Sequence, residues 1–160
     1  MGQFHARRAE GRPNRFRSAA IAFLVAFGLT VSAGAAIAGT ASGNKGYYSV
    51  GGYSYANQSI ITTGSTDTAR VEVWKNPRTG LVPAGYVGAL ARGYRDVTGT
   101  DPLVCSAGYY YNANATQGYA VNCYFTGSSG SAYYSYGVTK GWTGSVYNAY
   151  FAPRSPNQTA

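Results

Sequence analysis

Side chains that commonly carry out chemistry in proteins are sparse in this 160-residue chain. Its single histidine, His5, lies within the first 38 residues, which have the pattern of an export signal. The remaining chain of about 122 residues keeps two cysteines, Cys105 and Cys123, and no histidine. Catalysis by histidine and metal sites with histidine ligands are therefore excluded for the mature chain, and we expect no bound cofactor.

Carboxylates are the next candidates for chemistry, and the mature chain has four of them: Asp67, Glu72, Asp96 and Asp101. Glycoside hydrolysis requires a pair of carboxylates, but nothing in the sequence indicates that two of these act together. No motif places a base beside a serine or cysteine nucleophile. We therefore predict a protein without enzymatic activity.

The loop from Asp96 to Asp101 has two carboxylates that could bind calcium together with carbonyl oxygens. It lacks the regularly spaced acids and the closing glutamate of a calcium-binding loop. A polar turn is the favoured interpretation, and we predict no metal site.

The two cysteines predict one disulfide, because paired cysteines are typical of proteins outside the cytoplasm. A hairpin centred on Asn114 would place Cys105 opposite Cys123 and Tyr109 opposite Tyr119. On the chain-entropy estimate, closing this loop contributes about 3 kcal/mol to the free energy of unfolding.

Tyrosine is the strongest compositional signal, with 16 residues in the chain. Adjacent tyrosines on a strand face both of its sides, so some of them must be exposed or packed against a second layer. Exposed aromatic rings flanked by Asn, Ser and Gly suit stacking on sugars or contact with a protein. The alternative is that tyrosine replaces Leu and Ile in a small core. The candidate ligand-binding residues are Trp74, Tyr110, Tyr124 and Tyr133.

Basic residues exceed acidic ones, with a net charge of +8 for the whole chain and about +4 without the first 38 residues. Arg70, Arg92 and Arg95 are interleaved with aromatic residues, a pattern that suits anionic wall polymers or an acidic protein. Lys75 directly precedes the loop Asn76–Pro83, which we expect to be exposed, and Arg78 lies in it. These two are the candidate protein-contact residues. The alternative is that these charges are simply solvated, and we expect no nucleic-acid partner.

Residues 1–38 predict a signal peptide. Five arginines precede an apolar run from Ala19 to Val31, which is too short to span a bilayer comfortably. The Ala36-Ile37-Ala38 sequence then fits a signal-peptidase site, so that Gly39 becomes the new N-terminus. We therefore expect a secreted protein with no stable membrane anchor after cleavage.

The mature chain predicts a single β domain over residues 47–152, preceded by a flexible arm (39–46) and followed by an exposed tail (153–160). Short runs of Tyr, Val, Ile and Thr alternate with turn residues, which is typical of an all-β domain. We predict a small antiparallel β-sandwich or barrel of about seven or eight strands. The expected strands are 47–56, 59–63, 68–74, 85–94, 103–111, 118–125, 132–138 and 145–151.

Alternation is clearest in two segments. In Arg70–Trp74, Val71 and Val73 share one face, which predicts that they are buried. In Ser131–Val138, Tyr134 and Tyr136 share one face, while Tyr133 lies on the other.

Three segments carry a resemblance to a group of proteins: Val82–Ala89, Cys105–Asn112, and Val146–Tyr150 with Arg154–Asn157. In style and spacing, the mature chain resembles small Tyr/Gly-rich secreted proteins of actinobacteria that lack an assigned activity. The resemblance implies secretion and supplies no mechanism.

These observations favour a secreted, non-enzymatic binding module whose tyrosine-rich face contacts cell-wall or other polysaccharide. The alternative is a secreted protein-interaction protein, such as a protease inhibitor or a subunit of an extracellular assembly or toxin.

Overall fold

The structure is a computed structural model that describes residues 38–160. Every regular element in this part of the chain is a β-strand, and all strand pairs are antiparallel. The all-β prediction is therefore confirmed. The predicted signal peptide lies outside the described residues, apart from its last residue, Ala38.

Thirteen strands are found in the described residues, against the seven or eight that the sequence predicts. In chain order they are β1 (Gly39–Ser42), β2 (Gly46–Val50), β3 (Tyr53–Thr63), β4 (Asp67–Lys75), β5 (Val87–Leu90), β6 (Arg92–Arg95), β7 (Leu103–Ser106), β8 (Tyr110–Tyr111), β9 (Gly118–Phe125), β10 (Ala132–Ser135), β11 (Val138–Trp142), β12 (Tyr147–Phe151) and β13 (Gln158–Thr159).

The strands form three sheets. The five-stranded sheet has the order β1-β3-β4-β9, and β2 also pairs with β3. The two four-stranded sheets have the orders β13-β10-β6-β7 and β12-β11-β5-β8. Since β5 and β6 are separated only by Ala91, and β10 and β11 only by residues 136–137, the two four-stranded sheets continue one another.

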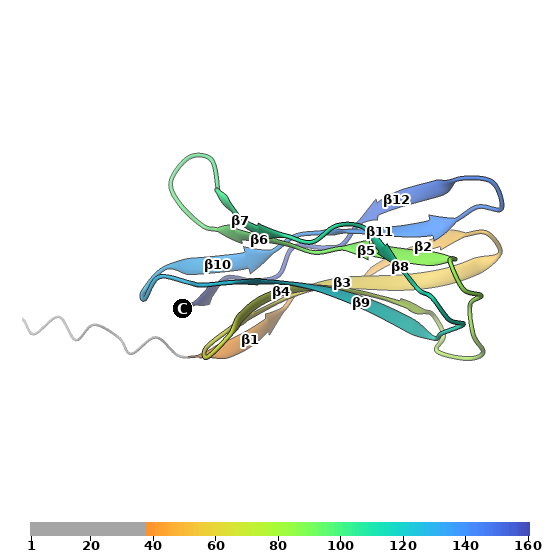
Figure 1. Ribbon diagram of the computed structural model, residues 1–160, viewed down its shortest axis with the longest axis horizontal. Coiled ribbons are helices and arrows are strands. Elements are labelled where there is room, and N and C mark those ends of the chain that lie inside the picture. Colours follow the sequence, from red (N-terminus) through yellow and green to blue (C-terminus); the bar gives the residue numbers. More distant parts are fainter. Residues whose placement is uncertain (1–37) are drawn as a thin grey trace, which may run out of the picture. The chain divides into compact units, whose positions relative to one another are not determined.

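The four-stranded sheets together form one layer, and the five-stranded sheet forms the other. Strand β4 contacts β5, β6, β10 and β11, which places the five-stranded sheet against both halves of the opposite layer. Figure 1 shows β4 and β9 below β5 and β6. At the junction of the two halves, a Cβ on Gly137 would lie 2.3 Å from the carbonyl oxygen of Leu90, so that only glycine fits there.

Side-chain alternation fills the space between the layers. Val71 and Val73 of β4 are buried as predicted, while Arg70 and Glu72 lie on the opposite face of the strand. Two groups of buried side chains make up the core. One is centred on Ile61, Val71, Val121 and Tyr133, and the other consists of Val50, Tyr55, Val73, Val82 and Val87.

The additional strands arise where the structure divides an expected strand. The predicted strand 47–56 is a hairpin of β2 and the start of β3, because Gly51 and Gly52 adopt positive φ values of 60° and 78° and reverse the chain. The predicted strand 59–63 is the end of β3. Three other predicted strands are divided: 85–94 between β5 and β6, 103–111 between β7 and β8, and 132–138 between β10 and the start of β11.

The predicted arm and tail both contain paired strands. Residues 39–42, predicted as part of a flexible arm, form β1 and pair with residues 60–63 of β3. Residues 158–159 of the predicted tail pair with Tyr133 and Ala132. Backbone hydrogen bonds hold these residues in the sheets. Because few of their side chains are apolar, the hydrophobic pattern of the sequence does not predict these two strands.

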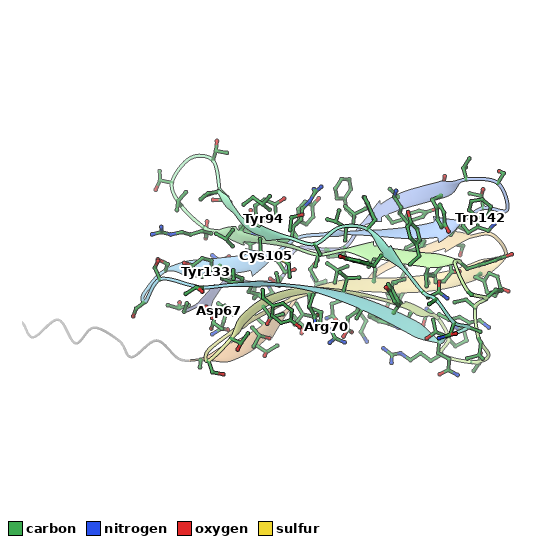
Figure 2. The ribbon with its side chains drawn as sticks, in the orientation of Figure 1. Asp67, Arg70, Tyr94, Cys105, Tyr133 and Trp142 are labelled. Carbon is green, nitrogen blue, oxygen red and sulfur yellow. A yellow bond between two sulfur atoms is a disulfide. The ribbon has the colours of Figure 1, made fainter. Side chains whose placement is uncertain are left out.

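The predicted disulfide between Cys105 and Cys123 is confirmed, with 5.8 Å between the two Cα atoms. The predicted hairpin around Asn114 is wrong. Strand β7 pairs with β6 and strand β9 pairs with β4, so the two cysteines belong to different layers. The disulfide thus joins the layers, near the position that Figure 2 labels Cys105.

Candidate functional site

The outer face of the layer formed by the four-stranded sheets has several groups of aromatic side chains. Tyr133 of β10 faces the core, so alternation turns Tyr134 to the outer face, where Tyr94 and Arg154 cover it and leave it 8% exposed. Lys140 and Trp142 of β11 also lie on the outer face and are half-buried. Figure 2 labels Tyr94 and Trp142 toward opposite ends of this layer. We call the following set the aromatic track: Tyr94, Tyr109, Tyr111, Tyr134, Tyr136, Trp142, Tyr147 and Phe151.

At one end of the track, Trp142 and Tyr147 are directly paired across β11 and β12, with ring centroids 4.9 Å apart. Tyr147 also lies 4.6 Å from the ring of Tyr111. Its hydroxyl donates a hydrogen bond of 2.5 Å to the carbonyl oxygen of Gly85, and burial raises the pKa of Tyr147. These contacts fix the ring beside a hollow of about 130 Å³. The hollow is lined by Ala84, Gly85, Tyr86, Trp142 and Tyr147.

In the middle of the track, small residues leave room for large side chains. Lys140 is paired with Gly88 on one side and Ala149 on the other, and its Nζ lies 3.9 Å from the centroid of the Tyr109 ring. A Cβ on Gly88 would lie 2.7 Å from the Tyr111 ring, so this ring rests on the backbone of β5. The absence of a side chain at Gly88 therefore allows Tyr111 to lie close to the sheet.

Further along, Tyr136 and Phe151 stack with their ring centroids 5.5 Å apart and an angle of 11° between the planes. Phe151 is 63% exposed, which is unusual for an apolar ring of this size. The pair therefore presents an open aromatic surface.

At the other end of the track, Tyr94 and Tyr134 stack with centroids 5.2 Å apart. The Tyr134 hydroxyl donates to Oδ2 of Asp101 at 2.8 Å, and the Arg154 guanidinium carbon lies 3.5 Å from the Tyr134 centroid. Burial, followed by the bond to Asp101, raises the pKa of Tyr134 to about 12. The pKa of Asp101 is lowered, first by the Val97 amide and then by Tyr134.

The four predicted ligand-binding residues do not form one site. Tyr110 is 57% exposed, and in the sequence it stands between the track residues Tyr109 and Tyr111. Tyr124 is 64% exposed, but it lies on β9 in the opposite layer. Tyr133 is only 2% exposed and faces the core, and its hydroxyl accepts a hydrogen bond from the Ser128 amide, so its ring is not at the surface.

The fourth predicted residue, Trp74, is 7% exposed and lies in the five-stranded sheet. Lys45 Nζ and the Arg78 guanidinium carbon lie over its ring, at 5.9 Å and 4.8 Å from the centroid. We call Lys45, Trp74 and Arg78 the Trp74 patch. Beside it is a hollow of about 300 Å³. Its lining consists of Arg70, Glu72, Val73, Trp74, Arg78, Gly118, Tyr119 and Ala120.

The predicted protein-contact residues contact different rings. Arg78 is exposed and lies over Trp74, whereas Lys75 Nζ lies 5.7 Å from the centroid of Tyr53. The sequence does not show that Lys75 and Arg78 contact different rings, because Lys75 precedes the same turn in which Arg78 lies. Only Arg78 belongs to the Trp74 patch.

The carboxylates of residues 38–160 all have hydrogen-bond partners. Asp67 accepts from the amides of Gly64 and Gly127, and Glu72 pairs with Arg70 at 2.5 Å. In the loop considered for calcium, Asp101 accepts from Val97 and Tyr134, and Asp96 accepts from Asn157. Within this described range, no three His, Cys, Asp or Glu side chains lie where they could hold a metal ion.

The sequence does not reveal most of the track. Its alternation in Ser131–Val138 did place Tyr134 and Tyr136 on one face, but it did not show which face meets solvent. The other track residues come from four separate segments, and their positions on one face depend on strand order.

Comparison with known proteins gives no relative: no protein-family model, curated protein or solved structure matches this chain. In the part of the chain that the structure describes, no helix could cross a membrane.

Proposed function

We propose that this protein is a secreted, non-enzymatic binding module, built on a small β-sandwich, whose aromatic track contacts cell-wall or other polysaccharide. The observation that carries the proposal is the row of eight aromatic side chains on one face of one layer. Aromatic groups that are spread over both halves of a layer suit a polymeric ligand better than a single small molecule.

Aromatic rings suit sugars because each gives a large, rigid, amphipathic contact area at low cost in conformational entropy. The rings of the track are already held by their neighbours. Tyr147 is fixed by Gly85 and Tyr111, and Tyr134 is fixed by Asp101 and Tyr94. Ligand binding would therefore order few side chains, which favours affinity.

The non-enzymatic part of the proposal rests on the mature sequence, which lacks histidine, and on the partners of the acidic residues. Asp67 is buried and bound to two amides, and Glu72 is paired with Arg70. These two carboxylates have structural roles, and neither belongs to the track.

Secretion is supported by the signal-peptide pattern of residues 1–38. The disulfide is compatible with an oxidising compartment. Strand β1 begins at Gly39, the residue predicted to be the first of the mature chain.

The test is sedimentation of the purified protein, expressed from the full chain, with washed bacterial cell walls. We expect Trp142→Ala and Tyr147→Ala each to reduce the bound fraction at least fivefold. Tyr124→Ala is the matched control, because it removes an exposed tyrosine from the opposite layer. Circular dichroism and thermal unfolding verify that each variant is folded. Unchanged binding by both track variants, or loss of binding in Tyr124→Ala, would contradict the proposal.

A protein partner is the second candidate function, and the Trp74 patch favours it. Two cations over one buried tryptophan, beside a hollow of about 300 Å³, form a cationic surface with an aromatic base. Under this alternative, the protein would retain a partner from culture supernatant, and Arg78→Ala would abolish that retention while Tyr147→Ala would not.

A further inference from the structure

Two positive charges on the outer face of the aromatic track have no acidic partner among the described residues. Alternation along β6 and β11 places Arg92 and Lys140 on this face. Neither residue takes part in either of the two ion pairs found among residues 38–160. Arg92 and Lys140, whose Nζ lies over the Tyr109 ring, therefore have positive charges that can attract an anion.

Two of the four acidic residues of the described part lie off the track, and the other two lie at its Tyr94 end. Asp67 lies between the layers, and Glu72 lies on the five-stranded sheet. Asp96 and Asp101 lie at the Tyr94 end of the track, where Arg154 Nη2 is 3.8 Å from Asp96. The charge of Arg154 is therefore partly compensated, whereas the middle of the track is purely cationic.

The spacing of the two free cations suits a polymer. Gly88 is paired with Lys140 and lies four residues before Arg92 along β5 and β6. At about 3.3 Å per residue, these two positions are roughly 13 Å apart along the strand direction, a span of a few sugar units. Between them lie Leu90 and Val138, which are paired with each other, and the stacked Tyr136 and Phe151.

We propose that the ligand of the aromatic track is a pyranose polysaccharide that bears carboxylates, a polyuronate. This inference rests on the proposed function. The sugar rings would stack on the aromatic side chains, and carboxylates would pair with Lys140 and Arg92. A chain of polyol phosphates has negative charge but no ring faces to stack, and a neutral glycan has ring faces but no charge.

The experiment compares three soluble polymers by isothermal titration calorimetry with the purified protein. Polygalacturonate has both rings and carboxylates. Its methyl ester has the same rings without the charge, and polyphosphate has charge without rings. We expect polygalacturonate to bind at least tenfold more tightly than either of the other two. Its affinity should also decrease with increasing salt, because ion pairs at an exposed surface are screened.

Two variants locate the effect. Lys140→Gln should reduce the preference for polygalacturonate over its ester at least threefold, while Lys45→Gln, on the opposite layer, should leave it unchanged. Equal affinity for polygalacturonate and its ester would overturn the inference and leave the proposed function standing. Polyphosphate binding as tight as polygalacturonate binding would overturn it as well, in favour of charge alone. If neither sugar polymer binds, and cell walls are not bound either, the proposed function itself fails.

Discussion

The side chain of Asn112 accepts a hydrogen bond from the amide of Val87 at 3.0 Å, which ties the end of the segment that carries Tyr109 and Tyr111 to the first residue of β5. Its amide group also donates to the carbonyl oxygens of Pro83 and Asn114, at 2.8 and 2.9 Å. Asn112 is buried, so these three bonds are made where water does not replace them easily. One polar side chain thus holds the middle of the aromatic track in place.

We therefore expect Asn112→Ala to lower the free energy of unfolding by about 1–3 kcal/mol, because it leaves buried donors and acceptors unpaired. Polysaccharide binding should weaken as well, since Tyr109 and Tyr111 lose their support. Asn114→Ala is the matched control, because only the backbone carbonyl of Asn114 takes part. Urea unfolding measures the stability, and equal stability of the two variants would contradict this role of Asn112.

Loss of the disulfide should destabilise the protein by about 3 kcal/mol on the chain-entropy estimate for a loop of this size. Because Cys105 and Cys123 lie in different layers, the Cys105→Ser/Cys123→Ser variant also loses a covalent link between the sheets. Denaturant unfolding with and without reductant is the measurement. Reductant should lower the denaturant concentration at the unfolding midpoint of the wild type and should not change the midpoint of the double variant. A wild-type midpoint that does not respond to reductant would show that the disulfide contributes little.

Stability should fall at high pH. Burial raises the pKa of Tyr55 to about 12 in the folded protein, with the neighbouring Tyr53 and Tyr86 adding to the effect. Tyr134 also has its pKa raised to about 12. As the pH rises from about 10 to about 12, tyrosines of the unfolded chain lose their protons while these two retain theirs, so ionisation favours the unfolded state. The stabilising contribution is complete below pH 10 and is lost as the pH passes 12.

Urea unfolding at several pH values between 8 and 12 measures this decline, with short incubations to preserve the disulfide. Tyr55→Phe should make the decline shallower. At neutral pH the same variant should be at least as stable as the wild type, because the Tyr55 hydroxyl is buried and has no hydrogen-bond partner among the described residues. A Tyr55→Phe variant that is markedly less stable at neutral pH would indicate a hydrogen bond to this hydroxyl.

Gly137→Ala should be strongly destabilising. The added methyl group would meet the Leu90 carbonyl oxygen at 2.3 Å and Val71 Cγ2 at 2.4 Å, both of which are parts of the packed interior. Overpacking of this kind typically costs about 1–3 kcal/mol. Gly108→Ala is the control, since its new Cβ would meet only the Tyr110 ring, at an ordinary 3.8 Å. Thermal unfolding compares the two, and similar melting temperatures would show that the junction of the two half-sheets can relax.

The sequence by itself determined the all-β class, the disulfide and the faces of individual strands. Val71 and Val73 alternate with polar residues, and alternation has the same meaning in any antiparallel sheet. The two cysteines are the only ones in the chain, so their pairing required no knowledge of the fold. Local patterns of this kind depend on neighbouring residues alone.

Only the tertiary structure decided which strands pair and which face meets solvent. The sequence around Asn114 is compatible with a hairpin, but β7 pairs with β6 and β9 pairs with β4, in separate layers. A local symmetry in the sequence does not reveal these distant partners. Tyr133 and Tyr134 are chemically identical neighbours, and the layer that packs against β10 decides which of them lies in the core and which lies on the outer face. The aromatic track contains residues between positions 94 and 151. The order of the strands brings them to one face, and no short segment of the sequence specifies that order.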